Sequence, residues 1–429
     1  MHTFPNPLHV KSNFPILTCS LPQAPTCESQ LSHSHMQRQS RFALQVLHLL
    51  PTNLMSSHLP TIVVFYFFLY NKPNVFIVGG KHMTNVEKKR LILFIAIAYG
   101  VTIIMSIFMK IGLNNGHDLS AFMNVMMTYP ACGVILGLLC FGDKEMKLPK
   151  IGYLVFLVTS AIMVVVALLS AFLPETMIES GAGLISNWNM YSQYVLLAGS
   201  AIAYILFWVC GKEKRKNAGL SRNHVLLSIA FVALFILFFV LRIYIGYGVV
   251  KLGGIDPGFD TLNATVFNLN TWITCGILLL NFPLTFIAFL GEEYGWRYYL
   301  QPIMQKKFGL RGGVLLLGVI WAIWHLGADF MFYSTDSGPQ MFVAQLITCV
   351  ALGIFFGYVF MKTQNIWAIA IMHYINNNFI VIFSGGDVNV LQNQTVSWGA
   401  LIVSLVQNLI FMAFILAPIY NKKKEVAES

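Results

Sequence analysis

The sequence predicts an all-α membrane protein, a polytopic bundle of eight to ten transmembrane helices, from three observations. Hydrophobic residues make up 57% of the 429 residues and charged residues only 10%, which lies outside the range of soluble globular domains. Apolar segments long enough to cross a bilayer recur along the chain, since one crossing needs about 20 helical residues. The loops between these segments alternate in charge, as expected for a chain that crosses the membrane repeatedly.

The first 82 residues differ from the rest of the chain. They are rich in Ser, Pro, His and Gln and hold seven of the eleven histidines. Their one apolar patch, Ile62 to Tyr70, is too short to span a bilayer. We expect residues 1–82 to be disordered or to be a non-native extension, because the sequence from Met83, MTNVEKKRLILF, resembles the start of a bacterial membrane protein.

Ten apolar segments follow Met83 and are the predicted spans. They cover residues 91–109, 121–141, 151–173, 191–210, 225–246, 271–303, 312–328, 341–361, 366–384 and 397–418. The chain accordingly divides into variable N-terminal transmembrane helices at 83–265, a core at 266–384, and a final helix with a basic tail at 385–429.

Basic residues mark every second loop after Met83. They include the groups at 88–90, 144–150, 211–216, 306–311 and 422–424, whereas the alternate loops carry Asp and Glu. The positive-inside rule then predicts a multi-pass protein with both termini in the cytoplasm. Anchoring of the spans explains the net charge of +10, so we expect membrane lipid and no nucleic acid as a partner.

The stretch FLGEEYGWRYYL, residues 289–300, places three charged residues inside an apolar segment. Glu292 and Glu293 lie near the middle of the helix predicted after Pro283, and Arg297 follows Glu293 by one turn. Ionisable groups at membrane depth are costly and usually face a protein interior or a water-filled cavity. The alternative is a span that ends at Leu290, with both acids and Arg297 in water.

Two later spans also carry polar residues. His325 lies in IWAIWHLGA and His373 in IAIMHYINNNF, and Asn377 follows His373 on the same helical face. Either histidine alone is explained as a hydrogen-bonded core residue. Because three separate spans each bring a polar group to membrane depth, one shared site is the more economical interpretation.

The residue types favour hydrolysis. A carboxylate and an imidazole around one water act as general base and proton shuttle, while a second imidazole and an amide donate hydrogen bonds to an oxyanion. Glu293 and Arg297 form an i, i+4 pair with a supporting role. A zinc site of Glu292, His325 and His373 is the second interpretation, because no HExxH sequence supplies the short-range ligand pair of common zinc proteases.

At these residues the sequence resembles the type II CAAX prenyl endopeptidases and their bacterial relatives, the CPBP or Abi intramembrane proteases, which include lysostaphin-resistance-like proteins. The family shows EExxxR, FxxxH and HxxxN on successive membrane helices, and this chain has EEYGWR, WAIWH and HYINN in the same order. The resemblance covers about Pro283 to Val381. Trp321 replaces the Phe of the second motif, and we expect one aromatic to preserve the packing of the other.

The resemblance implies a role for each motif residue. Glu292 and His325 would activate water, and His373 and Asn377 would hold the oxyanion, in a glutamate-based site without metal or other cofactor. The remaining motif residues would be structural: Glu293, Arg297 and Trp321.

The resemblance also implies a function and a location. The core at 266–384 would be a CAAX-protease-like catalytic core that hydrolyses peptide bonds of a membrane-associated peptide or protein. In the cell membrane of a bacterium, this activity would serve peptide or bacteriocin processing or self-immunity. A non-proteolytic immunity or scaffold protein and a proton-coupled transporter stay open as alternatives.

Overall fold

The computed structural model describes residues 77–78, 81–180 and 183–421. Most of the predicted extension at 1–82 and the basic tail after Asn421 lie outside these residues. The structure is 79% helical, which confirms the predicted all-α class. Strands are confined to two short antiparallel hairpins in the described part, β1 (Ile77–Val78) with β2 (Lys81–His82) and β3 (Met177–Ser180) with β4 (Gly183–Ser186).

Eight helical stretches of the described chain are long and apolar enough to cross a membrane, so the protein is a multi-pass membrane protein. Their elements are α4 (Asn85–Ile95), η1 (Ala96–Val101) and α5 (Thr102–Asn114); α6 (Ser120–Met126) and α7 (Tyr129–Phe141); α8 (Lys150–Phe172); α9 (Asn187–Val209); α11 (Val225–Leu252); α13 (Leu269–Glu293), η2 (Tyr294–Leu300) and α14 (Gln301–Trp324); α16 (Gly338–Thr363); and α17 (Ile366–Phe383).

Shorter helices connect and extend these stretches. They are α10 (Lys212–Asn217), α12 (Phe259–Val266), α15 (Leu326–Ala328), η3 (Asp329–Tyr333), α18 (Ala400–Met412), η4 (Ala413–Leu416) and η5 (Pro418–Asn421).

The number of spanning stretches is at the lower end of the predicted eight to ten for two local reasons. The predicted spans at 271–303 and 312–328 belong to one stretch, Leu269–Trp324, in which two helices meet at a break in the helical backbone at Gly309, where φ is 77° and ψ is 167°. Glycine adopts such a conformation at little cost. The predicted span at 397–418 is shorter than expected, because α18 tightens into the 3-10 helix η4 before Pro418 and the apolar stretch covers only Ala400–Leu416.

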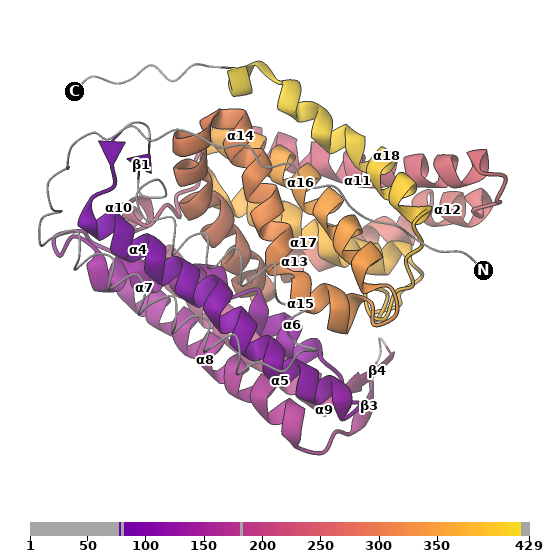
Figure 1. Cartoon of the computed structure of the whole chain (residues 1–429), viewed down its shortest axis with the longest axis horizontal. Coiled ribbons are helices and arrows are strands. Elements are labelled where there is room, and N and C mark those ends of the chain that lie inside the picture. The colour runs from indigo at the N-terminus through magenta and orange to yellow at the C-terminus, as the bar shows by residue number, and fades with distance from the viewer. Residues whose placement is uncertain (1–76, 79–80, 181–182, 422–429) are drawn as a thin grey trace, which may run out of the picture. The chain divides into compact units, whose positions relative to one another are not determined.

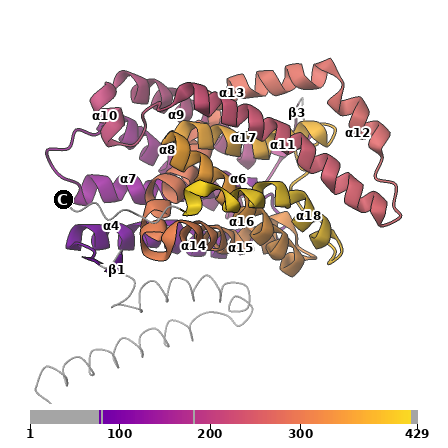
Figure 2. The ribbon, with the colours of Figure 1, turned by 90° about the horizontal axis from the view of Figure 1, so that it is seen from above.

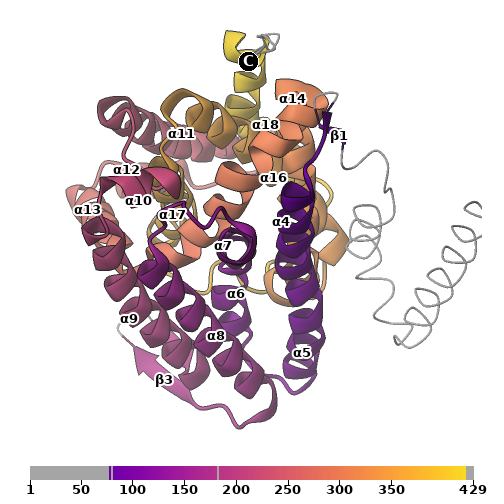
Figure 3. The same cartoon turned by 90° about the vertical axis from the view of Figure 1, so that its left-hand side faces the viewer.

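The elements before residue 210 and those after it form two neighbouring groups. Figures 1 and 3 show α4, α5, α7, α8 and α9 gathered on one side, where α8 packs on α9 and α4 packs on α7. Behind them, α13 packs on α17 and α14 packs on α16, and α16 also contacts α18, as Figure 2 shows from above. The helices that bear the three motifs are therefore packed against one another.

Two glycines let the helix that carries the glutamates closely approach the α6–α7 connection and the start of α7. A Cβ atom on Gly291 would lie 2.3 Å from the carbonyl oxygen of Met127, and one on Gly295 would lie 2.2 Å from Cβ of Pro130. Because these positions are four residues apart, they lie on one face of the helix. The position of the charged residues between them depends on this backbone contact.

The first prediction tests this contact. Gly295→Ala should lower the stability of the purified protein by about 1–3 kcal/mol, because the new methyl group overpacks a site closed by backbone atoms. Gly276→Ala on α13 is the matched control, since nothing lies within 4 Å of its added Cβ. Thermal unfolding in detergent would show a clear decrease in Tm for the first variant only. Equal Tm values would contradict the close contact.

Candidate active site

The structure places the predicted charged residues in the protein interior, at the junction of two helical segments. Glu292 and Glu293 end α13, and Arg297 lies in the π-helix η2 that begins at Tyr294. Their exposed fractions are 2%, 0% and 0%. The interpretation as a solvated helix end is therefore wrong. A π-helix at this position is notable, since these rare elements occur frequently at functional sites.

Glu293 joins two helices through its two carboxylate oxygens. Oε1 accepts a hydrogen bond from Nδ1 of His373 at 2.7 Å, and Oε2 lies 3.2 Å from Nε of Arg297. The predicted pair of Glu293 and Arg297 is present, whereas the partner on α17 was not predicted. Removing one partner of such a buried group leaves a charge without a partner and lowers the stability of the fold by about 3–5 kcal/mol.

Trp321 links Arg297 to Glu292. The guanidinium carbon of Arg297 lies 4.1 Å from the centre of the Trp321 ring, and the indole Nε1 donates a hydrogen bond of 2.7 Å to Oε2 of Glu292. A phenylalanine could stack under the guanidinium but has no N–H group to donate. The expectation that this position serves only packing is therefore incomplete, because Trp321 also orients the carboxylate of Glu292.

His325 caps the C-terminal end of α14, and one of its ring nitrogens is occupied. Nδ1 lies 2.9 Å from the carbonyl oxygen of Trp321, and Sγ of Cys349 lies 3.9 Å from the same nitrogen. A carbonyl oxygen only accepts hydrogen bonds, so Nδ1 carries the proton. In the neutral ring, Nε2 is then free to accept a proton, as a general base requires.

The amide of Asn377 is oriented by its neighbour. Nδ2 of Asn376 donates to Oδ1 of Asn377 at 3.0 Å, which leaves Nδ2 of Asn377 available as a donor. Asn376 was not among the predicted site residues, and its only signal is the run of three asparagines in HYINNNF.

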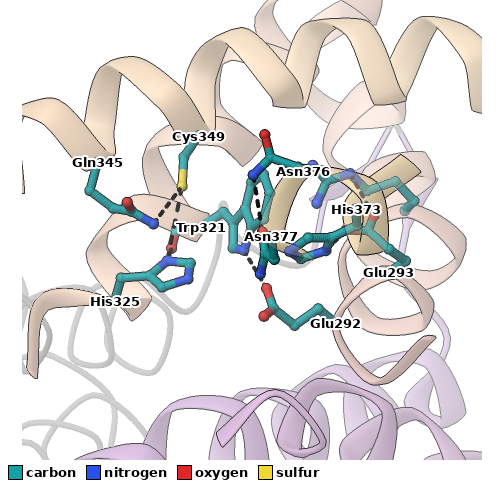
Figure 4. A network of polar contacts seen from close by, with 10 residues as sticks. Glu292, Glu293, Trp321, His325, Gln345, Cys349, His373, Asn376 and Asn377 are labelled. Atoms are coloured by element: carbon teal, nitrogen blue, oxygen red, sulfur yellow. Dashed lines mark hydrogen bonds and ion pairs between the residues drawn. The ribbon is translucent and has the colours of Figure 1, made fainter. Parts of the chain in front are cut away.

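The predicted catalytic residues line one cavity of about 850 Å³. Figure 4 shows Glu292, His325, His373 and Asn377 around a common space, and all four belong to the cavity wall, as does Trp321. Eleven of the 32 residues that line the cavity are Asn or Gln, so its wall is rich in amide groups. Glu293 and Arg297 do not line it. The four residues predicted to be catalytic therefore reach the cavity, and of the three predicted to be supporting only Trp321 does.

The alternative zinc site of Glu292, His325 and His373 stays a hypothesis. Within the described residues, no three His, Cys, Asp or Glu side chains are grouped closely enough to hold an ion. Nδ1 of each histidine and one oxygen of Glu292 are in hydrogen bonds with protein groups, and a histidine held in this way can still bind a metal through Nε2.

One buried acid close to the site was also missed. Asp329 lies four residues after His325, is 0% exposed, and neither of its carboxylate oxygens has a hydrogen-bond partner. Burial raises the pKa of its carboxyl group well above the usual range. The i, i+4 spacing in HLGAD is the signal that could have identified it.

Comparison with known proteins agrees with this geometry. The family model described as Type II CAAX prenyl endopeptidase Rce1-like matches residues 274–379, the part of the chain that holds all three motifs. This match confirms the family resemblance drawn from the motifs. The segment 274–379 is therefore similar to Rce1-like endopeptidases, and it lies within a multi-pass membrane protein. No curated protein and no solved structure matches the chain.

The second prediction concerns the indole of Trp321. Trp321→Phe should lower kcat for peptide cleavage roughly ten- to a hundredfold, because a hydrogen bond to a charged group contributes about 1.5–3 kcal/mol. Trp296→Phe is the matched control, since Trp296 is equally buried but its Nε1 has no hydrogen-bond partner. Both variants should lose similar packing and show similar Tm values. Unchanged turnover in Trp321→Phe would show that the hydrogen bond is dispensable.

Proposed function

We propose that this protein is an intramembrane endopeptidase of the CAAX type, with Glu292 and His325 as the groups that activate water. The observation that carries the proposal is the meeting of Glu292, His325, His373 and Asn377 on the wall of one cavity, inside the segment that matches the endopeptidase family. Proteolysis of this general kind is what the family match supports. The individual roles are our assignment.

Water activation follows from the hydrogen bonds of the two residues. Glu292 is held by the Trp321 indole through Oε2, which leaves Oε1 to accept a hydrogen bond from water. His325 offers Nε2 because Nδ1 is occupied by a backbone carbonyl. The pair takes one proton from the attacking water and delivers it to the leaving amine.

The oxyanion would be stabilised from the side of α17. His373 donates a hydrogen bond from Nδ1–H to Glu293. A second hydrogen bond, from Nε2–H to the substrate oxygen, therefore requires the doubly protonated ring. The Glu293 carboxylate stabilises that positive charge, and Arg297 balances the second oxygen. Asn377 adds a neutral donor through Nδ2.

We further propose a bacterial protein that processes membrane-associated peptides, such as bacteriocins, or protects its own cell. The amide-rich cavity wall supports a peptide substrate, because its groups match the hydrogen-bonding groups of a peptide backbone. The bacterial assignment rests on the resemblance of the motifs, and of the sequence from Met83, to bacterial membrane proteins. The alternation of basic loops favours both termini in the cytoplasm.

The third prediction tests the roles with full-length purified protein and a library of cellular peptides analysed by mass spectrometry. Glu292→Gln, His325→Ala and His325→Gln should abolish cleavage, because an amide cannot shuttle protons. Asn377→Ala should retain activity reduced on the order of a hundredfold, the usual effect of one lost oxyanion donor. His373→Gln should keep more activity than His373→Ala. Wild-type turnover in Glu292→Gln would remove the carboxylate from the mechanism.

The fourth prediction separates the metal-free mechanism from the zinc alternative. Purified active protein should contain no stoichiometric zinc by elemental analysis, and chelators should leave the cleavage rate unchanged. A zinc mechanism would instead require the metal for water activation, so removal would stop the reaction. Stoichiometric zinc that disappears in both His325→Ala and His373→Ala would make Glu292 and the two histidines metal ligands.

A further inference from the structure

A single arginine faces the cavity from outside the family-matched segment. Arg242 lies on α11 and belongs to the cavity wall, as do Glu292 and His325. Of the lining side chains, it is the only Lys or Arg, and Glu292 is the only Asp or Glu. The cavity wall therefore carries one residue of each charge: Glu292, which has a role in the proposed chemistry, and Arg242, which has none so far.

Arg242 has no anionic partner in the described part of the chain. It forms no ion pair and no hydrogen bond there. Its guanidinium carbon lies 5.3 Å from the ring centre of Phe239 and 5.9 Å from that of Phe411. Arginine within a membrane span is costly unless it faces a cavity or pairs with another group. A guanidinium on a cavity wall is suited to a carboxylate, which it can bind through two hydrogen bonds.

Two amide groups on the same cavity wall indicate which kind of anion fits. Asn408 and Asn376 also line the cavity, and their side-chain oxygens have no hydrogen-bond donor within the described residues. These oxygens need N–H groups, whereas Arg242 needs an acceptor. A peptide supplies both, with backbone N–H groups and a carboxylate, while an inorganic anion supplies only the second.

Helix packing gives the separation between Arg242 and the proposed oxyanion donors. The start of α17 is bonded to the start of α11 through Asn365 and Ser228, and the ring of Phe239 packs against Phe379 and Phe383. The two helices therefore run in the same direction, and Arg242 lies one turn beyond Phe239.

The distance along α17 can be expressed in peptide residues. From His373 to the level of Phe379 and Phe383, the helix rises roughly 9–15 Å, at 1.5 Å per residue, and the further turn from Phe239 to Arg242 adds about 4.5 Å. An extended peptide covers about 3.3–3.6 Å per residue. The total rise of roughly 13–20 Å corresponds to about four to six residues of bound peptide.

We propose that Arg242 is a carboxylate-binding subsite that holds a substrate carboxylate about four to six residues from the bond to be cleaved. The carboxylate is either the free C-terminus of the peptide or the side chain of an Asp or Glu at that distance. This inference rests on the proposed endopeptidase function and adds to it a specificity-determining residue outside the three motifs.

The test compares peptides cleaved by the wild-type protein in three forms: with a free C-terminal carboxylate, with a C-terminal amide, and with an amide plus Asp about four to six residues from the cleaved bond. Arg242→Gln should raise KM for the preferred carboxylate form on the order of ten- to a hundredfold, with little change in kcat, and should cleave all forms equally well. Arg242→Lys, which keeps the charge, should retain a reduced preference. Lys251→Gln, a charge removal on the same helix outside the cavity wall, should behave as wild type.

The outcomes distinguish the two proposals. A preference for the free C-terminus or for the Asp-containing amide identifies the source of the carboxylate, provided that Arg242→Gln removes it. An unchanged preference in Arg242→Gln, or in Arg242→Ala if the first variant unfolds, overturns the subsite while the endopeptidase function stands.

If wild-type protein cleaves no peptide, the proposed function fails. Binding of the same peptides to the Glu292→Gln protein then decides the subsite, which stands only if adding Arg242→Gln weakens binding of the carboxylate form.

Discussion

The buried carboxylate of Glu293 is the interaction on which the rest of the site depends. It accepts from His373 on α17 with one oxygen and faces Arg297 in η2 with the other. Arg297 in turn stacks on Trp321, whose indole holds Glu292. One acid that never reaches the cavity thereby sets the orientation of groups that do. In a low-dielectric interior, such a network is stable only when every charge has its partner.

This network exists because the backbone around it is packed unusually closely. Gly291 and Gly295 allow the helix to touch the α6–α7 connection and the start of α7, where any side chain would collide with backbone or proline atoms. The change from α13 to the π-helix η2 occurs directly after Glu293. Catalytic side chains keep a narrow range of positions when the residues that contact them are themselves rigidly packed.

The cavity provides polar surroundings inside an apolar helix bundle. In our proposal, its amide-rich wall would bind the hydrogen-bonding groups of a peptide, which are costly to leave unpaired at membrane depth. Arg242, contributed by α11 rather than by the three motifs, shows that the helices outside the family-matched segment also shape this space. In our proposal, the matched segment supplies the chemistry and the other helices supply part of the substrate recognition.

The helical membrane fold could be predicted from the apolar segments, because such segments have few other stable backbone arrangements in lipid. The motif residues could also be identified, because charged and polar residues are rare within membrane spans. The Glu293–Arg297 pair followed from its i, i+4 spacing, whereas the structure was needed to choose burial of Glu292 over a solvated helix end. Only the tertiary structure revealed the bond of His373 to Glu293, the indole donor of Trp321 and the position of Arg242 on the cavity wall. These contacts join helices far apart in the chain, and periodicity within one helix carries no information about which partner its polar face meets.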